Sequence, residues 1–367
     1  MSLFTPVTGI VGGTLIGASA GTLLVLNGDI MGISGILSNS LLHPVKTLRD
    51  PKHHWRWVWI ASFSLTVNIY VYFINPQRAL RDDDRSLAHD VPIPSWPAHI
   101  LGGLLVGIGT RIGNGCTSGH GICGISRFSL RSLVATCTFT GTAILTQFVL
   151  SPLRGWSSWT HFLRTSKTPY WHPWASALFT SAVCMAALVR PIPVPETLQD
   201  KKEQIVAQNK GLGAALSGMM FALGLSISGM TKTSKVHDFL CLSGFSNNTY
   251  DPTLMTVMAS GILASLLSYQ MLSDYSVTKK SLLDGPISLP RGSSFSVPTN
   301  QAIDKKLMLG AAIFGTGWGL TGICPGPGLY AAAAGVVSAL VAWMPSFLLG
   351  SHLGINFADY LSKKKLL

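Results

Sequence analysis

The sequence predicts an all-α integral membrane protein, and three observations indicate this fold class. Hydrophobic residues make up 47% of the 367 residues and charged residues only 11%, whereas a soluble domain carries about 25% charged residues. The chain contains 38 glycines, which are common in membrane helices because they let backbones approach closely. The uncharged runs are each near the ~20 residues that a helix needs to cross a bilayer, which a large soluble core does not explain.

Nine apolar runs divide the chain, and about nine transmembrane helices are therefore expected. The runs fall at roughly 6–27, 55–74, 96–112, 130–152, 171–189, 211–228, 252–272, 306–322 and 329–361. Gly and Pro interrupt or end several of them, as in transporter helices that stop inside the membrane. The last run is long and contains Pro345, so we expect one span with a bent extension.

The expected location is the cell membrane, plasma or inner, and the basic residues predict that the N-terminus is outside and the C-terminus inside. In this orientation 19 of the 27 Lys and Arg residues fall on the inner side, as the positive-inside rule requires. The net charge of +12 then follows from membrane topology. No nucleic-acid partner is expected, because the basic residues lie between the apolar runs and do not gather in one patch.

Four glycine-rich segments recur along the chain, at 12–35, 102–126, 217–240 and 310–328. A shift of 208 residues places Cys324 on Cys116, and a shift of 201 residues places Gly218 on Gly17. The first segment therefore pairs with the third, and the second with the fourth. Five spans separate the paired segments, so the two halves cross the membrane in opposite directions. The sequence predicts an inverted internal repeat.

The repeat divides the chain into two transmembrane halves. The first is expected over 1–190, including a linking helix at 171–189, and the second over 211–367, with an inner linker at 191–210. Broken or re-entrant helices from the two halves are expected to meet at the centre in an hourglass-like arrangement. Secondary transporters of this architecture place the substrate site where the repeats meet.

Two motifs carry most of the expected chemistry. Gly113–Ser126 reads GNGCTSGHGICGIS, and Thr321–Gly328 reads TGICPGPG. Gly and Pro are too dense in both for a regular helix to continue. Irregular backbone at membrane depth is tolerated only where it is buried in protein or lines a wet cavity. It exposes N–H groups and the positive ends of the helices that follow, which suits an anion.

The cysteines in these motifs favour a sulfur-containing anion, because a thiol is a weak donor with a soft, polarizable sulfur. Cys116 and Cys324 coincide in the repeat and are the expected ligand-contacting thiols. Ile30–Ser34 echoes Ile122–Ser126, which places the thioether of Met31 where a third thiol would stand. The predicted binding set comprises Cys116, Cys324, Cys123, His120, Met31, Gly115, Ser118 and Gly326.

Other uses of these side chains remain open at this point. The pattern Cys116-x3-His120-x2-Cys123, completed by Cys324, could hold a transition metal. Neither cysteine motif contains an acidic residue to balance a cation, so no metal and no cofactor are expected. The remaining cysteines are expected to be structural; they are Cys137, Cys184 and Cys241.

Three motifs resemble those of the YeeE/YedE sulfur-transport family. They are Gly-x-Gly-Cys116-Thr-Ser-Gly-His120-Gly, Gly322-Ile-Cys324-Pro-Gly-Pro-Gly328, and Gly229-Met230 with the Lys235-Val-x-x-Phe-Leu stretch that follows. The resemblance covers both halves. It implies an hourglass-shaped importer of thiosulfate in which Cys116 and Cys324 act as relay thiols. Thiosulfate-importing members carry a further cysteine in the first repeat loop, where this chain has Asp29-Ile-Met31-Gly-Ile-Ser34. Sulfite, sulfide and selenium compounds therefore remain alternative substrates.

The expected function is membrane transport of a small sulfur-containing anion, most simply thiosulfate, and not catalysis. The alternatives are a membrane sulfurtransferase in which a cysteine takes a persulfide with His120 as its base, and a metal transporter. The expected partners are a small inorganic sulfur anion and the lipid bilayer, with a cytosolic sulfur-accepting protein as a further candidate. Both halves lie in one chain, so no second subunit is needed to complete the pore.

Overall fold

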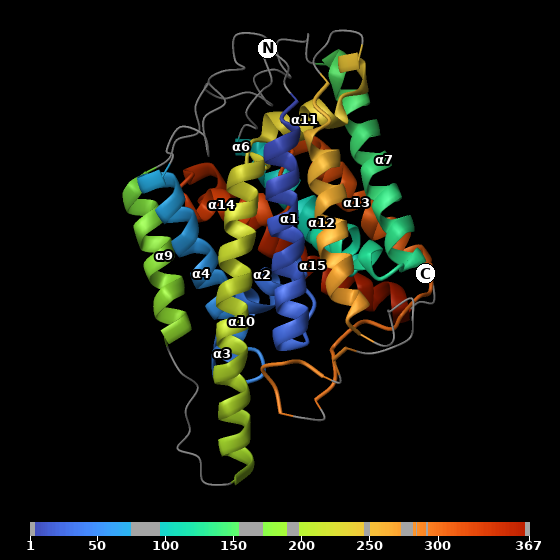
Figure 1. The fold of residues 1–367 in the computed structure, drawn as a ribbon. Helices are drawn as coiled ribbons and strands as arrows, with labels where there is room; N and C mark the ends of the chain where they lie inside the picture. The colour runs from blue at the N-terminus through green and yellow to red at the C-terminus, as the bar shows by residue number, and fades with distance from the viewer. Residues whose placement is uncertain are drawn as a thin grey trace.

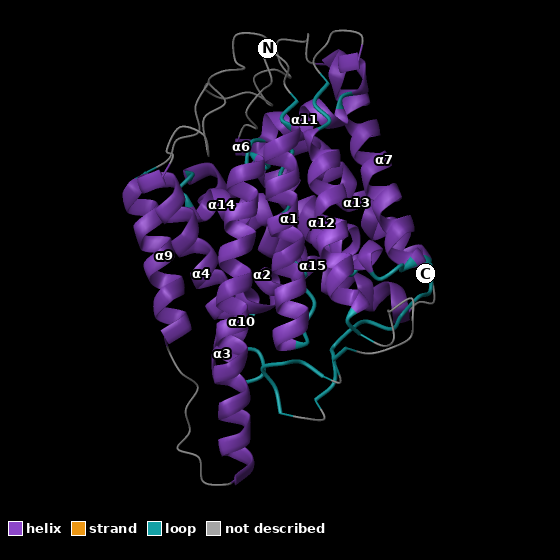
Figure 2. Cartoon of the chain, viewed as in Figure 1, coloured by secondary structure: helices purple, strands orange, loops and turns teal. Residues whose placement is uncertain are grey.

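A computed structural model describes residues 4–74, 96–153, 172–188, 198–245, 250–272, 282–283, 285–290 and 293–363. These residues form helices joined by turns and loops (Figure 2), and an isolated bridge pairs Asp29 with Ser296. The orientation also depends on basic residues in 75–95, 154–171, 189–197, 273–281, 291–292 and 364–367, which lie outside the described residues.

The helices of the first half run from the N-terminus to residue 188. They are α1 (Pro6–Thr22), continued by a π-helical turn η1 (Leu23–Asn27), then α2 (Ile33–Leu42), α3 (Pro44–Arg49), α4 (Trp55–Ile69) with η2 (Tyr70–Ile74), α6 (Trp96–Ile112), η3 (Thr117–Gly124), α7 (Leu130–Leu153) and α9 (Pro173–Leu188). The second half contains α10 (Leu198–Ser228), α11 (Thr233–Leu240), η4 (Leu242–Phe245), α12 (Thr253–Gln270), α13 (Lys305–Thr321), α14 (Pro325–Ala333), η5 (Ala339–Trp343) and α15 (Met344–Lys363).

Six helical stretches are long and apolar enough to cross a membrane, or seven if the bent pair α13 and α14 counts as one. This holds for the described part of the chain and confirms an all-α integral membrane protein. Each of the nine expected runs contains a helix, but α6, α9 and α13 have only 16 or 17 residues. The count of nine spans stays a prediction.

Two details of the expected boundaries differ from the structure. The run 329–361 breaks at Ala334 and Gly335, and Gly335 has a φ of +84°. Pro345 instead lies inside one helical stretch, Ala339–Tyr360, in which η5 runs directly into α15. The expected linker 191–210 is helical from Leu198 onward, because Lys, Glu, Gln and Ala there favour a helix. The division into halves at these points stays a prediction.

The long helices run side by side through the molecule (Figure 1). α1 packs between α10 and α12, while α6 packs against both α13 and α15. α1 and α10 are antiparallel, since Ser19 meets Ser217 and Asn27 meets Lys210. α6 and α13 are antiparallel too, with closest approaches at glycines that admit no side chain.

The contacts between α6 and α13 come in reciprocal pairs. Gly102 lies against Thr321, and Gly113 lies against Gly310. Adding 208 to the first glycine gives 310, and subtracting 208 from Thr321 gives 113. Moving each residue of the Gly102–Thr321 contact to its equivalent in the other half therefore gives the Gly113–Gly310 contact.

The same exchange relates the remaining helices at an offset of 201 or 208 residues. Gly12 of α1 meets Ser228 of α10, and Gly213 meets Asn27. The backbone of Phe347 in α15 packs against Gly107 of α6. Its counterpart is Phe139 in α7, which packs against Gly315 of α13. The list of such counterparts is α1 with α10, α4 with α12, α6 with α13, and α7 with α15. α9 packs against α4 outside this scheme.

Each of the four glycine-rich segments breaks in the same way. A long helix ends at a residue with positive φ, a few residues of irregular chain follow, and a short helix then begins. The four positive-φ residues are Gly28, Asn114, Gly229 and Gly322, with φ between 55° and 73°. The short helices are α2, η3, α11 and α14. The breaks therefore direct four helix N-termini into the interior.

A buried ion pair anchors the third break. Lys235 of α11 donates to Asp251 over 3.1 Å and to Thr5 over 2.9 Å, and the side chain of Asp251 is fully buried. We expect Lys235→Met to lower the free energy of unfolding by about 3–5 kcal/mol, because it leaves a carboxylate buried without its cation. The melting temperature in detergent should fall accordingly. The exposed Lys46→Met is the matched control and should leave the melting temperature unchanged. Equal melting temperatures for both variants would contradict this role.

A segment of the second half crosses the end of the first, and residues 293–304 are called the strap here. Ser296 donates its N–H to Gly28 O over 2.7 Å, beside the bridge to Asp29. Arg127 donates to Pro298 O over 2.6 Å, and Arg131 donates to Ala302 O. Just before the strap, the N–H groups of residues 287 and 288 donate to the carbonyls of Val25 and Leu26 in η1.

Candidate functional site

The two cysteines expected to contact the ligand begin two of the short helices. Cys116 is the N-cap of η3 and Cys324 is the N-cap of α14, and both have extended backbone angles. Thr117 Oγ1 donates to Cys324 Sγ over 3.5 Å, which brings the second and fourth segments together. Cys116 is buried and Cys324 is partly exposed. Two helix N-termini, each preceded by a cysteine, therefore lie next to each other.

Ser118 connects this pair to the first glycine-rich segment. Its hydroxyl lies 3.2 Å from Cys116 Sγ and accepts the N–H of Ile33 over 3.2 Å. Because the Ser118 oxygen accepts from the backbone, its proton is available to the thiol sulfur or to a ligand. Three of the four breaks are thus joined through small polar side chains.

A cavity of about 240 Å³ opens on the thiol side of these contacts. Cys116, Thr117, Ser118 and Cys324 line it together with Gly326. The rest of its wall is mostly apolar, with side chains such as Phe139, Phe221, Met230 and Trp318. A Cβ at Gly326 would lie 3.1 Å from the Phe221 ring, so a glycine keeps this wall open. We call it the thiol cavity.

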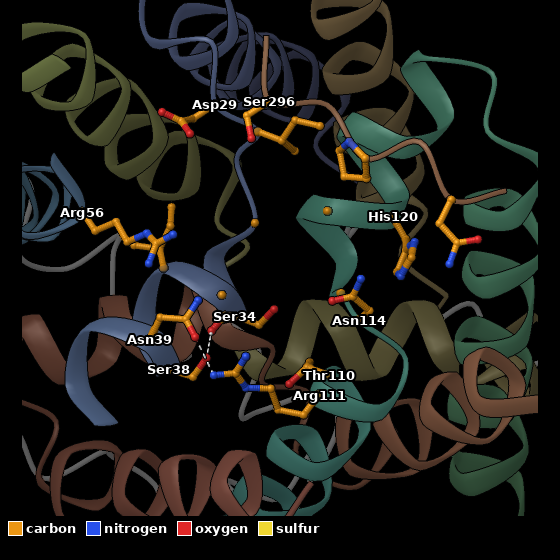
Figure 3. Close-up of a pocket in the computed structure, with 18 of the residues that line it drawn as sticks. Asp29, Ser34, Ser38, Asn39, Arg56, Thr110, Arg111, Asn114, His120 and Ser296 are labelled. Atoms are coloured by element: carbon orange, nitrogen blue, oxygen red, sulfur yellow. Dashed lines mark hydrogen bonds between the residues drawn. The ribbon is translucent and has the colours of Figure 1, made fainter. Parts of the chain in front are cut away.

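A second cavity, of about 370 Å³, lies on the other side of the same loop. Its wall is polar, and Figure 3 shows Arg56, Asn39, Arg111, Asn114 and His120 arranged around a common space. Arg127, Arg131 and three strap residues complete it; the strap residues are Ser296, Pro298 and Asn300. We call it the arginine cavity.

One loop separates the two cavities. Gly115, Gly119 and His120 face the arginine cavity, whereas Cys116, Thr117 and Ser118 face the thiol cavity. The first glycine-rich segment divides in the same way, since Gly32 and Ser34 line the arginine cavity and Ile33 lines the thiol cavity. The partition is therefore one or two residues thick and carries the Cys116 thiol.

His120 is fixed within this partition. Its Nε2 donates to Gly113 O over 3.0 Å, because a carbonyl can only accept, and Ser132 Oγ lies 3.1 Å from Nδ1. One ring nitrogen therefore has a partner in the loop before η3, and the other has a partner in α7. A Cβ at Gly115 would lie 2.6 Å from the ring, so Gly115 makes room for His120. These contacts position the loop, and the expected contact of His120 with a ligand stays a prediction.

Cys123 and Met31 lie behind the partition and are not among the residues that line either cavity. Cys123 Sγ donates to Met31 O over 3.6 Å, and Met31 Sδ accepts from Ser19 Oγ over 3.3 Å. Both side chains are almost completely buried. Their contacts join the second segment to the first, and any contact with a ligand stays a prediction.

In the described part of the chain, no three His, Cys, Asp or Glu side chains lie close enough to hold a metal ion. The alternative set of Cys116, His120, Cys123 and Cys324 is divided by the geometry. The His120 ring binds Gly113 and Ser132, while Cys123 faces Met31.

The sequence interpretation missed two features of the site. Thr117 follows Cys116 directly and is the residue that contacts Cys324, which the repeat alignment could not show. Arg56, Arg111, Arg127 and Arg131 were counted only as loop charges. Their positions at helix ends next to the broken segments are the signal that could have indicated a lined cavity.

Two family models match the chain. A model described as sulphur transport matches residues 91–145, which contain the Cys116 motif. A model for a family of unknown function matches residues 210–359, which contain the Cys324 motif. The two matches fall in different halves.

Curated relatives from Xylella fastidiosa are named probable transporters. One from strain Temecula1 is 41% identical over 130 residues, which are 35% of this chain and 84% of the relative. Another from the same strain is 32% identical over 128 residues, 35% of this chain and 77% of the relative. Each relative is therefore less than half as long as this chain.

The apolar helices, the paired cavities and these relatives define an integral membrane transporter. The chain belongs to the YeeE/YedE-like sulfur-transport family.

Proposed function

We propose that this transporter imports a small sulfur-containing anion, thiosulfate in the first instance, past the thiols of Cys116 and Cys324. The observation that carries the proposal is the partition between the two cavities. It places Cys116, Thr117 and Ser118 on one face and Cys324 beside them, at two helix N-termini. On this proposal the anion passes these groups on its way from one cavity to the other.

The chemistry of the thiol cavity suits an anion with a sulfur end. The apolar wall removes water from the ion, and the thiols and hydroxyls offer weak donors in its place. Helix N-termini add a positive field without a fixed cation that would hold the ion too tightly. The arginine cavity beyond the partition attracts negative charge, so passage ends in a favourable potential.

The inverted repeat is part of the proposal. The exchange-related contacts, the antiparallel α1 and α10, and relatives of less than half the length all support two halves of opposite orientation. With the N-terminus outside, the arginine cavity faces inward, as the positive-inside rule favours. A cytosolic sulfur-accepting protein would then collect the anion on that side.

Uptake of ³⁵S-labelled thiosulfate in bacterial cells that lack their own importer tests the function. Cells with the intact chain should accumulate label at least tenfold above cells with empty vector. Unlabelled thiosulfate should compete, and sulfate should compete poorly because it lacks the soft terminal sulfur. Vector-level uptake at verified membrane expression would contradict thiosulfate as the substrate.

The same cells distinguish transport from sulfur transfer. A relay through neutral thiols leaves the protein unmodified after exposure to thiosulfate, since no bond to sulfur forms. A persulfide on Cys116 detected by mass spectrometry would instead favour the sulfurtransferase.

A further inference from the structure

The arginine cavity carries far more positive than negative charge. Four arginines line it, and Asp29 is the acidic residue in the described wall. The Asp29 carboxylate pairs with Lys210 over 2.7 Å. Positive charge in the cavity is therefore not neutralised by its own wall.

Two of the four arginines are engaged by the strap. Arg127 donates to Pro298 O, and Arg131 donates to Ala302 O and lies 3.5 Å from Asp304. Their hydrogen bonds fix one wall of the cavity. The other two, Arg56 and Arg111, come from α4 and from the end of α6.

Arg111 is held by an amide rather than a carboxylate. Its Nη2 donates to Asn39 Oδ1 over 2.6 Å, as the dashed line in Figure 3 marks. The buried Nε of Arg111 has no hydrogen-bond partner within the described residues. Because Asn39 accepts through Oδ1, its amide nitrogen adds further N–H donors at this wall.

Arg56 faces the same space and is close enough to Arg111 for the two charges to repel. The carboxylates that attract Arg56 are Asp29 and Asp50. Asp29 is paired with Lys210, while Asp50 accepts from the Lys52 N–H and lies 2.5 Å from His53 Nδ1. Two guanidinium groups therefore share a cavity, and among the described residues neither forms an ion pair with a carboxylate.

We propose that Arg56, Arg111 and Asn39 form a binding site for a small divalent oxyanion. An anion with two negative charges would balance both guanidinium groups and accept from the donors of Asn39 and Arg111. The inference rests on the proposed function, since the ligand is then the transported sulfur anion after it has passed the partition. It adds a second, electrostatic holding site to the thiol site.

Binding of ³⁵S-thiosulfate to the purified full chain in nanodiscs of neutral lipid tests this site separately from transport. Arg56→Gln and Arg111→Gln should each weaken binding at least tenfold. The control Arg49→Gln removes the same charge from the exposed helix α3 and should bind as the intact chain does. The double variant Cys116→Ala/Cys324→Ala should retain binding, because the arginine cavity is intact.

Several outcomes overturn the proposal. One is unchanged binding by both arginine variants that elute as folded protein. Another is loss of binding in the cysteine double variant alone, which would place the bound ion at the thiols. A third is loss of thiosulfate binding when phosphatidylglycerol replaces the neutral lipid, together with retention of this lipid by the intact chain but not by Arg56→Gln. The site would then bind a lipid headgroup. Arginine-dependent binding without uptake in cells would support this site and contradict the proposed function.

Discussion

Cys324→Ala is expected to reduce thiosulfate uptake by roughly 10- to 100-fold at equal membrane levels. Hydrogen bonds to charged groups contribute about 1.5–3 kcal/mol each, and a dehydrated ion in the thiol cavity has few other donors. Cys324 lines this cavity and accepts a hydrogen bond from Thr117, which lines the same cavity. Cys116→Ala is expected to act in the same way, because its thiol lies at the partition itself.

Cys137→Ala is the matched control for these variants. Cys137 is exposed on α7, so the same substitution there should leave uptake unchanged. Cys324→Ser separates two roles, since a hydroxyl still donates a hydrogen bond but does not form a persulfide. Partial uptake by the serine variant would support donation by the thiol. Full uptake by both alanine variants would rule out a path through the thiols.

The second large effect is expected at the contact between α6 and α13. A Cβ at Gly109 would lie 2.6 Å from Phe314 Cα and 2.7 Å from Gly310 O, both of which belong to backbone. Gly109→Ala therefore forces two central helices apart. We expect little or no folded protein, measured as the monodisperse fraction in fluorescence-detected size-exclusion chromatography.

Gly141→Ala provides the comparison for this variant. Gly141 lies on α7, and a Cβ there would meet nothing within 4 Å. Alanine favours a helix over glycine by up to about 1 kcal/mol, so this variant should elute as the intact chain or melt slightly higher. Similar yields of the two variants would show that the close approach of α6 and α13 is not required for folding.

Much of the fold could be predicted because membrane helices and their breaks leave local signals. The apolar runs located every long helix, and the glycine-rich segments located all four breaks. The pairing of Cys116 with Cys324 followed from the repeat offset and agrees with the contact through Thr117. Length and hydropathy did not decide whether helices of 16 or 17 residues cross the membrane.

The position of a side chain within the site could not be predicted from its motif. Cys123 and Met31 share the chemistry of the relay thiols, but helix packing turns them behind the partition. The arginine cavity depends on residues from α2, α4 and α6 and on the strap, which are distant in sequence. Only the folded chain brings these residues together.

The strap is attached mainly through main-chain atoms, together with the side chain of Asp304, which lies 3.5 Å from Arg131. These contacts decide which strap residues can vary. Its N–H at 296 and its carbonyls at 298 and 302 make the described contacts, while Phe295 and Val297 pack on the core. Most of its other side chains can therefore vary, provided that its length, the two apolar positions, Asp304 and the N–H at 296 are kept. Homologous straps should preserve a spacing more than a sequence, and insertions between residues 296 and 302 should be rare.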